Sequence, residues 1–489
     1  MIKVRTHNLY KYERIIFFLT MFCFIISILY VCFKDNYFWY DESGQFWMAK
    51  GLNHYSPPYS ETSDLRSVIE NNRFYNLDPG GFTILLHFWS MISNEALFLK
   101  LLPFLFFIGT CVLSYLIINR ITKDILLSII AATLPIIYPL LFWNALFLRA
   151  YSMEMCGTMF CIYVLQNFTK INTYIRIILI SIIISLFCTS RYGFIIVSFI
   201  VSLRILYKLY LHNTKRKWII KSILFGLPLL ITTSIIYILM AKYQNSNNTI
   251  YGYSDTLYES YILYFDRNSI LFYIMCSLYL YKKLKGIYIE ELHLDAILIT
   301  SIFFCLSSLN LYPWTYQRMI SVTMLLIYAL FVELCKYVLY KKYMKSILML
   351  AIVTFTAYEY HNNVYFKHLE LSIDAKELEH YIKTKKPSHI FIHAGYVPDI
   401  RYLYEYGYLK HAAIQDNYPK SFYLQKGFRH QKIFKKERIQ ISPLYGFDKD
   451  NFDVYMARSG VRSINELTKY PNKYQLVPEC RSLYIKKVK

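Results

Sequence analysis

Long apolar blocks separated by short polar connections dominate the chain. Several blocks contain stretches nearly or wholly free of charge, as at residues 21–32, 97–118, 177–187, 219–240 and 319–334. A helix that crosses the hydrocarbon core of a bilayer needs about 20 predominantly apolar residues. The pattern therefore predicts a mainly α-helical, polytopic membrane protein.

The limits of the apolar blocks predict about eleven transmembrane helices. The first covers residues 15–33 and follows a basic start; it lacks a small-residue cleavage site, so it is interpreted as a retained helix and not as a signal peptide. After a long polar loop at 34–93, further helices are expected at 95–118, 125–142, 149–168, 175–190, 192–210, 219–241, 268–281, 293–311, 317–338 and 346–360.

Charge in the connections predicts the orientation. Basic residues mark cytoplasmic loops, and they gather at the N-terminus and in alternate connections near residues 120–123, 170–176, 208–221, 282–285 and 336–345. The N-terminus is therefore predicted in the cytoplasm, and the first long loop on the outer side of the cytoplasmic membrane.

The same orientation places the polar tail outside. Strand-like runs ("HIFIHAG", "FDVYMA", "SLYIKK") and a helix-like "DAKELEHYIKT" predict a small extracytoplasmic α/β domain at 361–489. Residues 1–360 would form the transmembrane domain, which includes the outer loop 34–93.

Composition narrows the function classes. Only 18% of the 489 residues are charged, against about a quarter in soluble proteins. The net charge of +22 does not indicate a nucleic-acid partner, because the basic residues lie in short loops. No metal-ligand spacing, dinucleotide-binding motif, P-loop or HExxH motif occurs, and the D-x-D pair Asp448 and Asp450 is interpreted as a polar turn.

Four arginines depart from the predicted charge distribution, because they fall on the outer side. Arg149, Arg191 and Arg318 each lie at the outer end of a predicted helix beside Tyr or Trp, and Arg267 opens another helix. A charged residue at such a depth is costly unless it is paired or hydrated, so it is a functional candidate. Snorkelling, or a salt bridge to a loop carboxylate, is the structural alternative.

Carboxylates lie on the same predicted face. Asp41 and Glu42 stand among aromatics in "FWYDESGQFWMAKGL", and Asp78 precedes Pro and two Gly in "YNLDPGGFTILLHFW". Structural alternatives are a helix N-cap for Asp78 and a favourable helix-dipole position for Asp41, with the aromatics forming an interfacial belt.

Carboxylates and arginines together suit one kind of chemistry at this interface. A carboxylate can take the proton of an attacking hydroxyl, and arginine pairs bidentately with phosphate oxygens. A sugar donor with a lipid-phosphate leaving group requires both. Glu154, about one turn beyond Arg149, is interpreted as an arginine partner or a pocket-lining residue.

These residues resemble, in order and approximate spacing over about 15–340, the GT-C superfold of integral-membrane glycosyltransferases, near the protein O-mannosyltransferases and the lipid A aminoarabinose transferases. The quoted elements are the Asp41–Glu42 pair, "LDPGGFTILLHFW", "LRAYSMEM", "SRYGFI" and "QRMISV". Two departures are "DPGG" in place of a double proline, and Met after Arg318 in place of Tyr.

The resemblance implies roles for individual residues. Asp41 would be the catalytic base, Glu42 its partner, and Asp78 a residue lining the donor or acceptor pocket. The lipid phosphate and sugar would be bound by residues near the other elements: Arg149, Tyr151, Arg191, Tyr192, Arg318 and His87.

The resemblance also implies an activity. An inverting hexosyl- or pentosyltransferase of the cell envelope would move a sugar from a polyprenyl-phosphate donor to a lipid, glycan or protein acceptor. It needs no soluble cofactor, and a divalent metal has no support from ligand spacing. The alternatives are a membrane polysaccharide polymerase or ligase, and a transporter or flippase of lipid-linked sugars.

Overall fold

The computed structural model describes most of the helical part of the chain. Described are residues 38, 40–51, 64–76, 78–244, 266–309, 312, 318–338 and 342–361, single positions between 15 and 26, a few helical residues between 377 and 385, and the strands of the C-terminal region. The predicted first helix at 15–33 and most of the polar tail lie largely outside these residues.

The chain divides into two compact units. The first unit comprises Met1–Ile28, Asn72–Phe82 and Leu102–Asn362, and the second comprises Leu29–Asn71, Thr83–Leu101 and Asn363–Lys489. The predicted outer loop 34–93 is thus shared between the units and does not belong to one of them.

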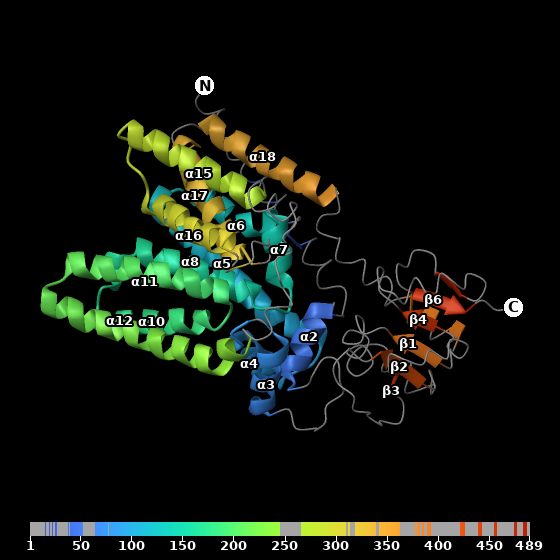
Figure 1. Cartoon of the computed structure of the whole chain (residues 1–489). Helices are drawn as coiled ribbons and strands as arrows, with labels where there is room; N and C mark the ends of the chain where they lie inside the picture. The colour runs from blue at the N-terminus through green and yellow to red at the C-terminus, as the bar shows by residue number, and fades with distance from the viewer. Residues whose placement is uncertain are drawn as a thin grey trace. The chain divides into compact units, whose positions relative to one another are not determined.

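Helices make up the described part of the first unit (Figure 1). Their bounds are α5 (Ala96–Thr122, which begins in the second unit), α6 (Ile125–Ile137), α7 (Pro139–Leu146), α8 (Tyr151–Gln166), α9 (Phe168–Ile171), α10 (Tyr174–Cys188), α11 (Tyr192–His212), α12 (Lys215–Ile236), the π-helix η1 (Tyr237–Ala241), α13 (Lys242–Gln244), α15 (Arg267–Leu284), α16 (Glu291–Ser308), α17 (Ile320–Val338) and α18 (Lys342–His361). Every predicted helix between residues 95 and 360 therefore coincides with helical structure.

Helix α17 forms the centre of the first unit. In its most apolar 18-residue stretch 72% of the residues are buried, against 17% in the helix at Lys215–Gln244. Helix α17 packs against α8, α15 and α16. Helices α10 and α12 lie side by side (Figure 1). A helix that is apolar on all sides but mostly exposed is expected to face lipid, so α12 is suited to the periphery and α17 to the interior.

Five described helices are long and apolar enough to cross a bilayer: Ala96–Thr122, Tyr192–His212, Lys215–Gln244, Glu291–Ser308 and Ile320–Val338. The protein is accordingly an α-helical membrane protein, but the predicted count of eleven spans is not supported. At 1.5 Å per residue, α6 with its 13 residues extends only about 20 Å, less than the ~30 Å hydrocarbon core.

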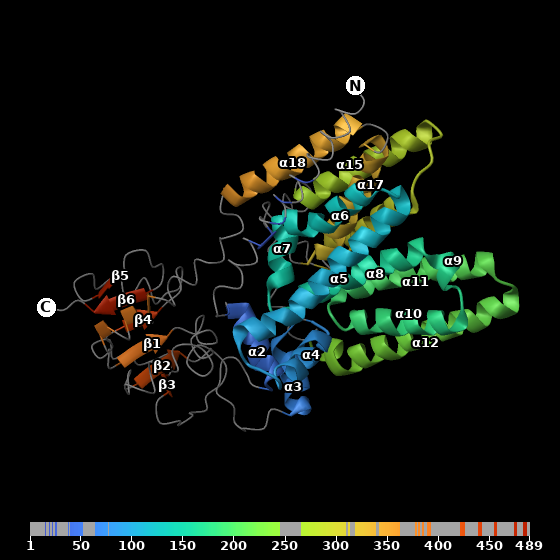
Figure 2. The same ribbon diagram turned by 180° about the vertical axis from the view of Figure 1, so that it is seen from behind.

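A proline explains the clearest error in the predicted helices. The single helix expected at 125–142 is divided into α6 and α7 (Figure 2), with Pro139 at the start of α7. The residue before proline is disfavoured in the α region, and Tyr138 has the extended angles φ −87° and ψ 105°. The apolar composition continues through the break, so hydropathy alone did not reveal it.

Short helices from the predicted outer loop contribute to the second unit: α2 (Tyr40–Ala49), the first part of α3 (Leu65–Tyr75) and most of α4 (Gly81–Trp89). Side chains connect the α2 and α4 regions, since Gln45 donates to Thr83 Oγ1 at 2.7 Å and Lys50 Nζ donates to the Ser90 carbonyl at 3.1 Å. The aromatic residues Phe46 and Trp47 are fully buried.

The C-terminal region contains a six-stranded sheet in the order β3-β2-β1-β4-β6-β5. The strands are β1 (His389–Ile392), β2 (Ser421–Gln425), β3 (Ile439–Ser442), β4 (Val454–Met456), β5 (Tyr474–Leu476) and β6 (Leu483–Lys486). Strand β1 pairs in parallel with β2 and β4, and β6 pairs antiparallel with β4 and β5. Three strands coincide with the predicted runs; the connections lie outside the described residues, so the α/β domain stays a prediction.

Candidate functional site

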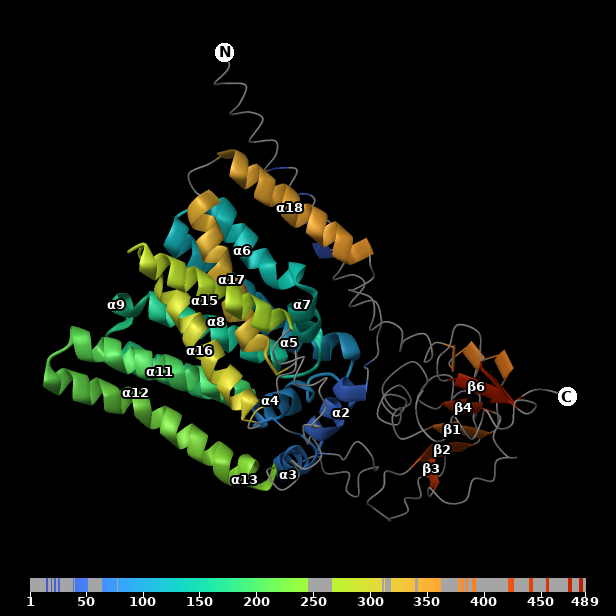
Figure 3. The same cartoon turned by 45° about the horizontal axis from the view of Figure 1, so that its top comes forward.

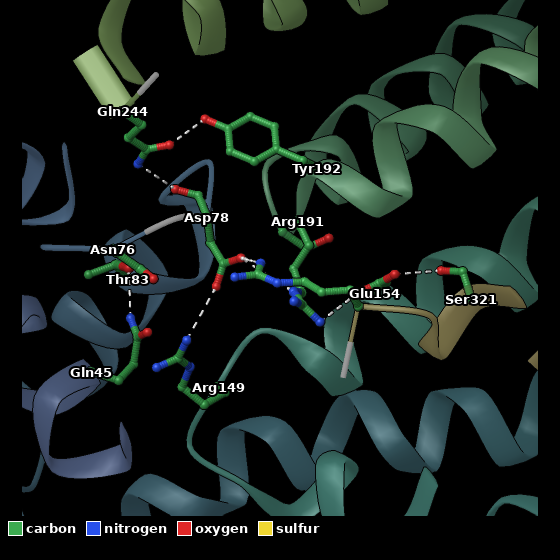
Figure 4. A network of polar contacts seen from close by, with 12 residues as sticks. Gln45, Asn76, Asp78, Thr83, Arg149, Glu154, Arg191, Tyr192, Gln244 and Ser321 are labelled. Atoms are coloured by element: carbon green, nitrogen blue, oxygen red, sulfur yellow. Dashed lines mark hydrogen bonds and ion pairs between the residues drawn. The ribbon is translucent and has the colours of Figure 1, made fainter. Parts of the chain in front are cut away.

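Three arginines surround the carboxylate of Asp78, which is 5% exposed and lies between α3 and α4 (Figure 4). Arg191 Nε lies 3.3 Å from Oδ1, Arg318 Nη1 lies 3.6 Å from Oδ1, and Arg149 Nη2 lies 3.8 Å from Oδ2. Four of the predicted site residues, far apart in the sequence, are therefore neighbours in space.

Helix starts bring these arginines together. Arg149 lies just before α8, Arg191 is the extended residue that precedes α11, and Arg318 lies two residues before α17. Because α8, α11 and α17 pack against one another, their N-terminal ends lie close. A helix N-terminus carries a partial positive charge, which adds to that of the guanidinium groups.

Glu154 is a second carboxylate in the cluster. Arg191 Nη1 lies 3.2 Å from Glu154 Oε2, and Ser321 Oγ donates to Glu154 Oε1 at 2.7 Å. Arg191, at 3% exposure, therefore joins two buried carboxylates through different nitrogen atoms. The prediction that Glu154 pairs with an arginine is confirmed, and the partner is Arg191.

The arginines control the ionisation of Asp78. Burial by itself raises the pKa of a carboxyl group, but the charges of Arg191, Arg318 and Arg149 outweigh this effect and hold the pKa of Asp78 below its ordinary value. Asp78 is therefore a stable anion and a weak proton acceptor. The described contacts of its carboxylate are with arginines and not with the first amides of α4, so the N-cap alternative does not describe this residue.

Two tyrosines contact the arginines of the cluster. The Arg191 guanidinium carbon lies 4.4 Å from the ring centroid of Tyr151, within the range of a cation–π contact. Tyr312 Oη donates to the Arg318 carbonyl at 3.4 Å, and burial raises the pKa of Tyr312, so its hydroxyl stays protonated. Tyr151 was among the predicted site residues, whereas Tyr312 was not.

Glycines allow the Asp78 loop to approach Arg191 closely. Gly81 N donates to the Thr189 carbonyl at 2.9 Å, and a Cβ atom added to Gly81 would lie 1.8 Å from Thr189 Oγ1. Gly80 has φ +92°, in the region that favours glycine. The two glycines of "DPGG" are therefore required by backbone geometry at this site.

Three of the other predicted residues, Asp41, Glu42 and His87, belong to the second unit, whereas Tyr192 belongs to the first. Asp41 is half-buried and Glu42 is buried, both in the first turn of α2. His87 is buried on α4, and its Nδ1 forms a 2.7 Å hydrogen bond with the Ala49 carbonyl at the end of α2. This contact gives His87 a structural role within its unit.

The charge balance of the cluster favours an anion. Its five charged side chains comprise three arginines and two carboxylates, so positive charge exceeds negative charge when all are ionised. Arg318 retains 24% exposure and Arg149 16%, so both remain accessible from solvent. Within the part of the chain that the structure describes, no group of three or more His, Cys, Asp or Glu residues is arranged to hold a metal ion.

Sequence analysis missed several polar residues around Asp78. Ser321, Gln244 and Asn72 each form hydrogen bonds in this network. Gln244 and Asn72 lie near helix ends outside the quoted motifs, and Ser321 lies within "QRMISV" but was given no role; only the fold brings the three together. No protein-family model matches the chain, and no curated protein sequence is significantly similar to it.

Proposed function

We propose that this protein is a membrane glycosyltransferase that moves a sugar from a polyprenyl-phosphate donor to a hydroxyl acceptor on the outer face of the cytoplasmic membrane. The observation that carries the proposal is the convergence of Arg149, Arg191 and Arg318 on Asp78 at the ends of apolar helices. The proposal includes a GT-C-type fold with an extracytoplasmic C-terminal α/β domain.

The arginine cluster would bind the phosphate of the donor. Guanidinium groups match phosphate oxygens geometrically and stay charged at all physiological pH values. The partly exposed Arg318 and Arg149 would contact the phosphate, while the buried Arg191 holds the two carboxylates in place. When the bond between the sugar and the phosphate breaks, the cluster stabilises the charge on the leaving group.

Asp78 would orient the arginines and would not act as the base. Its pKa lies below the ordinary value because three guanidinium charges favour the ionised form. A carboxylate with lowered proton affinity is a poor general base at neutral pH. Asp78 and Glu154 would instead keep the guanidinium groups apart from one another and fixed in direction.

The base would be Asp41, with Glu42 as its partner, as the resemblance to the GT-C family implies. The acceptor hydroxyl attacks the anomeric carbon, its proton passes to Asp41, and the carbon–oxygen bond to the phosphate breaks with its electron pair on the phosphate. One displacement inverts the configuration. Tyr151, which borders Arg191, would contact the sugar or the prenyl phosphate, whereas the Tyr192 hydroxyl donates to Gln244.

Transfer from a labelled polyprenyl-phosphate sugar to membrane acceptors tests this function. Wild-type membranes should transfer label. Arg318→Gln should raise the donor KM at least about tenfold, because a charge-assisted phosphate contact is lost. Arg267→Gln is the matched control, since Arg267 is an exposed arginine at the start of α15. Asp41→Asn should lower kcat by about 100-fold or more.

The outcomes separate the parts of the proposal. Normal transfer by a folded Asp41→Asn variant would remove Asp41 as the base and leave the arginine site standing. Equal effects of Arg318→Gln and Arg267→Gln would contradict the phosphate site. Uptake of the donor into vesicles without any transfer would replace the proposal with a flippase.

A further inference from the structure

The side-chain amide of Gln244 donates hydrogen bonds to backbone carbonyls of the Asp78 loop and of the end of α3. Its side chain is buried at the end of α13, and Nε2 donates to the carbonyl of Asp78 at 3.2 Å and to that of Asn72 at 3.3 Å. The Asn72 carbonyl also accepts the backbone hydrogen bond of Asn76 N at 3.1 Å, at the end of α3. The amide of Gln244 therefore joins the end of α3 to the residue that carries the central carboxylate.

Tyr192 orients this amide. The two backbone carbonyls can only accept hydrogen bonds, so the nitrogen of the Gln244 amide faces them and the oxygen faces the other way. Tyr192 Oη donates to that oxygen at 2.6 Å (Figure 4). Tyr192 is the first residue of α11 and directly follows Arg191. The residue that orients the Gln244 side-chain amide is therefore the sequence neighbour of the arginine that pairs with Asp78.

A second amide supports the same carbonyl. Asn72 Nδ2 donates to the Asp78 carbonyl at 3.0 Å, and Asn76 Nδ2 donates to Asn72 Oδ1 at 2.9 Å. The Asp78 carbonyl thus accepts two side-chain hydrogen bonds, while the contacts of its carboxylate within the described residues are with arginines. Backbone and side chain of Asp78 are held by separate sets of partners.

An irregular helix presents Gln244 to the loop. The π-helix η1 lies between α12 and α13. Figure 3 shows α13 at the end of α12. Arg73 Nε donates to the Leu239 carbonyl at 2.8 Å, and its guanidinium carbon lies 4.1 Å from the Tyr243 ring centroid. Such π-helical turns are frequent at functional sites. Here the turn attaches the end of α12 to α3 and places Gln244 beside Asp78.

We infer that the Tyr192–Gln244 pair is a positioning device that fixes the backbone of Asp78 and thereby the direction of the arginine cluster. Gln244 and Tyr192 would then determine how tightly the cluster binds an anionic phosphate donor, without contact to the reacting atoms. The effect on the donor rests on the proposed function. The effect on the order of the loop does not.

A double-mutant cycle measures the coupling directly. Gln244→Met keeps the length of the side chain and removes both the donor and the acceptor, and Tyr192→Phe removes only the hydroxyl. In hydrogen–deuterium exchange of the purified protein, Gln244→Met should speed exchange over residues 76–82 by about tenfold, with exchange in α17 unchanged. Tyr192→Phe should speed it less, and the double variant should match Gln244→Met alone.

Tyr207→Phe is the matched control, because Tyr207 lies on the same helix α11 and is 56% exposed. Additive effects of the two substitutions, or exchange over 76–82 that Gln244→Met leaves unchanged, would overturn the inference. In the transfer assay, Gln244→Met should raise the donor KM about tenfold with kcat and the acceptor KM within about twofold. A fall in kcat at unchanged donor KM would show a different role and also overturn it.

The inference and the proposed function can fail separately. Coupled loosening of residues 76–82 in a wild-type protein that transfers no sugar would retain the positioning pair and refute the glycosyltransferase. Transfer by the wild type, with no coupling between Tyr192 and Gln244, would do the reverse.

Discussion

Arg191 Nε lies 3.3 Å from Asp78 Oδ1, although the two residues are 113 positions apart in the chain. The same guanidinium reaches Glu154 with its Nη1 atom at 3.2 Å. One buried cation therefore joins the loop before α4 to the first turn of α8. The fork of the guanidinium, which offers several donors in fixed directions, is what makes this double contact feasible.

Replacement of Arg191 by Lys should lower the stability of the protein, because one side chain would no longer contact both Asp78 and Glu154. An ammonium group is a point charge on a flexible stem and cannot reproduce both contacts. Because one buried carboxylate then loses its partner, the free energy of unfolding should fall by about 3 kcal/mol. Thermal unfolding in detergent measures the change. Arg267→Lys, at an exposed arginine, should leave the midpoint unchanged, and a similar shift in both variants would contradict the role of Arg191.

The stability provided by Asp78 should depend on pH in one direction. Its folded-state pKa is lowered, mainly by the three arginines against the opposing effect of burial. A group with a lowered folded pKa contributes stability above its unfolded pKa of about 3.9, and the contribution disappears as the pH falls toward the folded value. Wild type should therefore exceed Asp78→Asn in thermal stability by a constant amount between pH 8 and 5. The difference should shrink below about pH 4; a loss already complete at pH 6 would refute the assignment.

Gly81→Ala should displace the Asp78 loop. The added Cβ would lie 1.8 Å from Thr189 Oγ1 and 2.8 Å from the Thr189 carbonyl, which accepts the hydrogen bond of Gly81 N. The donor KM should rise at least tenfold, as expected for a lost phosphate contact. Gly226→Ala is the control, since nothing lies within 4 Å of its added Cβ and alanine favours the interior of α12. Indistinguishable donor KM values for the two variants would show that the close approach is dispensable.

A second charged cluster should affect stability and not transfer. Glu333 on α17 pairs with Lys282, with His293 Nδ1 at 3.4 Å and with Lys336 Nζ at 3.7 Å. Glu333→Gln leaves several cationic or polar groups of α15, α16 and α17 without their common anion, so the unfolding free energy should fall by about 3 kcal/mol. The donor KM should stay within twofold of wild type. The exposed Glu95, changed to Gln, is the control for both measurements; an equal effect on stability would contradict the cluster's role.

The helices could be predicted from sequence because apolar runs must form helices in a bilayer, where backbone groups have no water to bond. Their lengths were less predictable. The α6–α7 break depends on one peptide before Pro139, and composition does not register it. Among the described residues the structure supports five spans and not the predicted eleven, since apolar character does not report whether a helix is straight and long enough.

The site was partly predictable. The charge asymmetry between loops singled out Arg149, Arg191 and Arg318, and the fold brings all three to Asp78. Nothing near Gln244 in the sequence distinguishes it from an ordinary polar residue at a helix end, and Ser321 lies within "QRMISV" without a predicted role. Their role arises from contacts with residues 166 and 167 positions away.

By itself the sequence determined that the chain forms apolar helices, where most of them begin, and which charged residues stand at unusual positions. These properties follow from local composition and periodicity. Only the tertiary structure decided that the Asp78 carboxylate pairs with three arginines, that Arg191 also pairs with Glu154, and that Gln244 donates a hydrogen bond to the Asp78 carbonyl. The reason is physical: a buried charge is stable only beside its partners, and helix packing selects those partners from segments far apart in the chain.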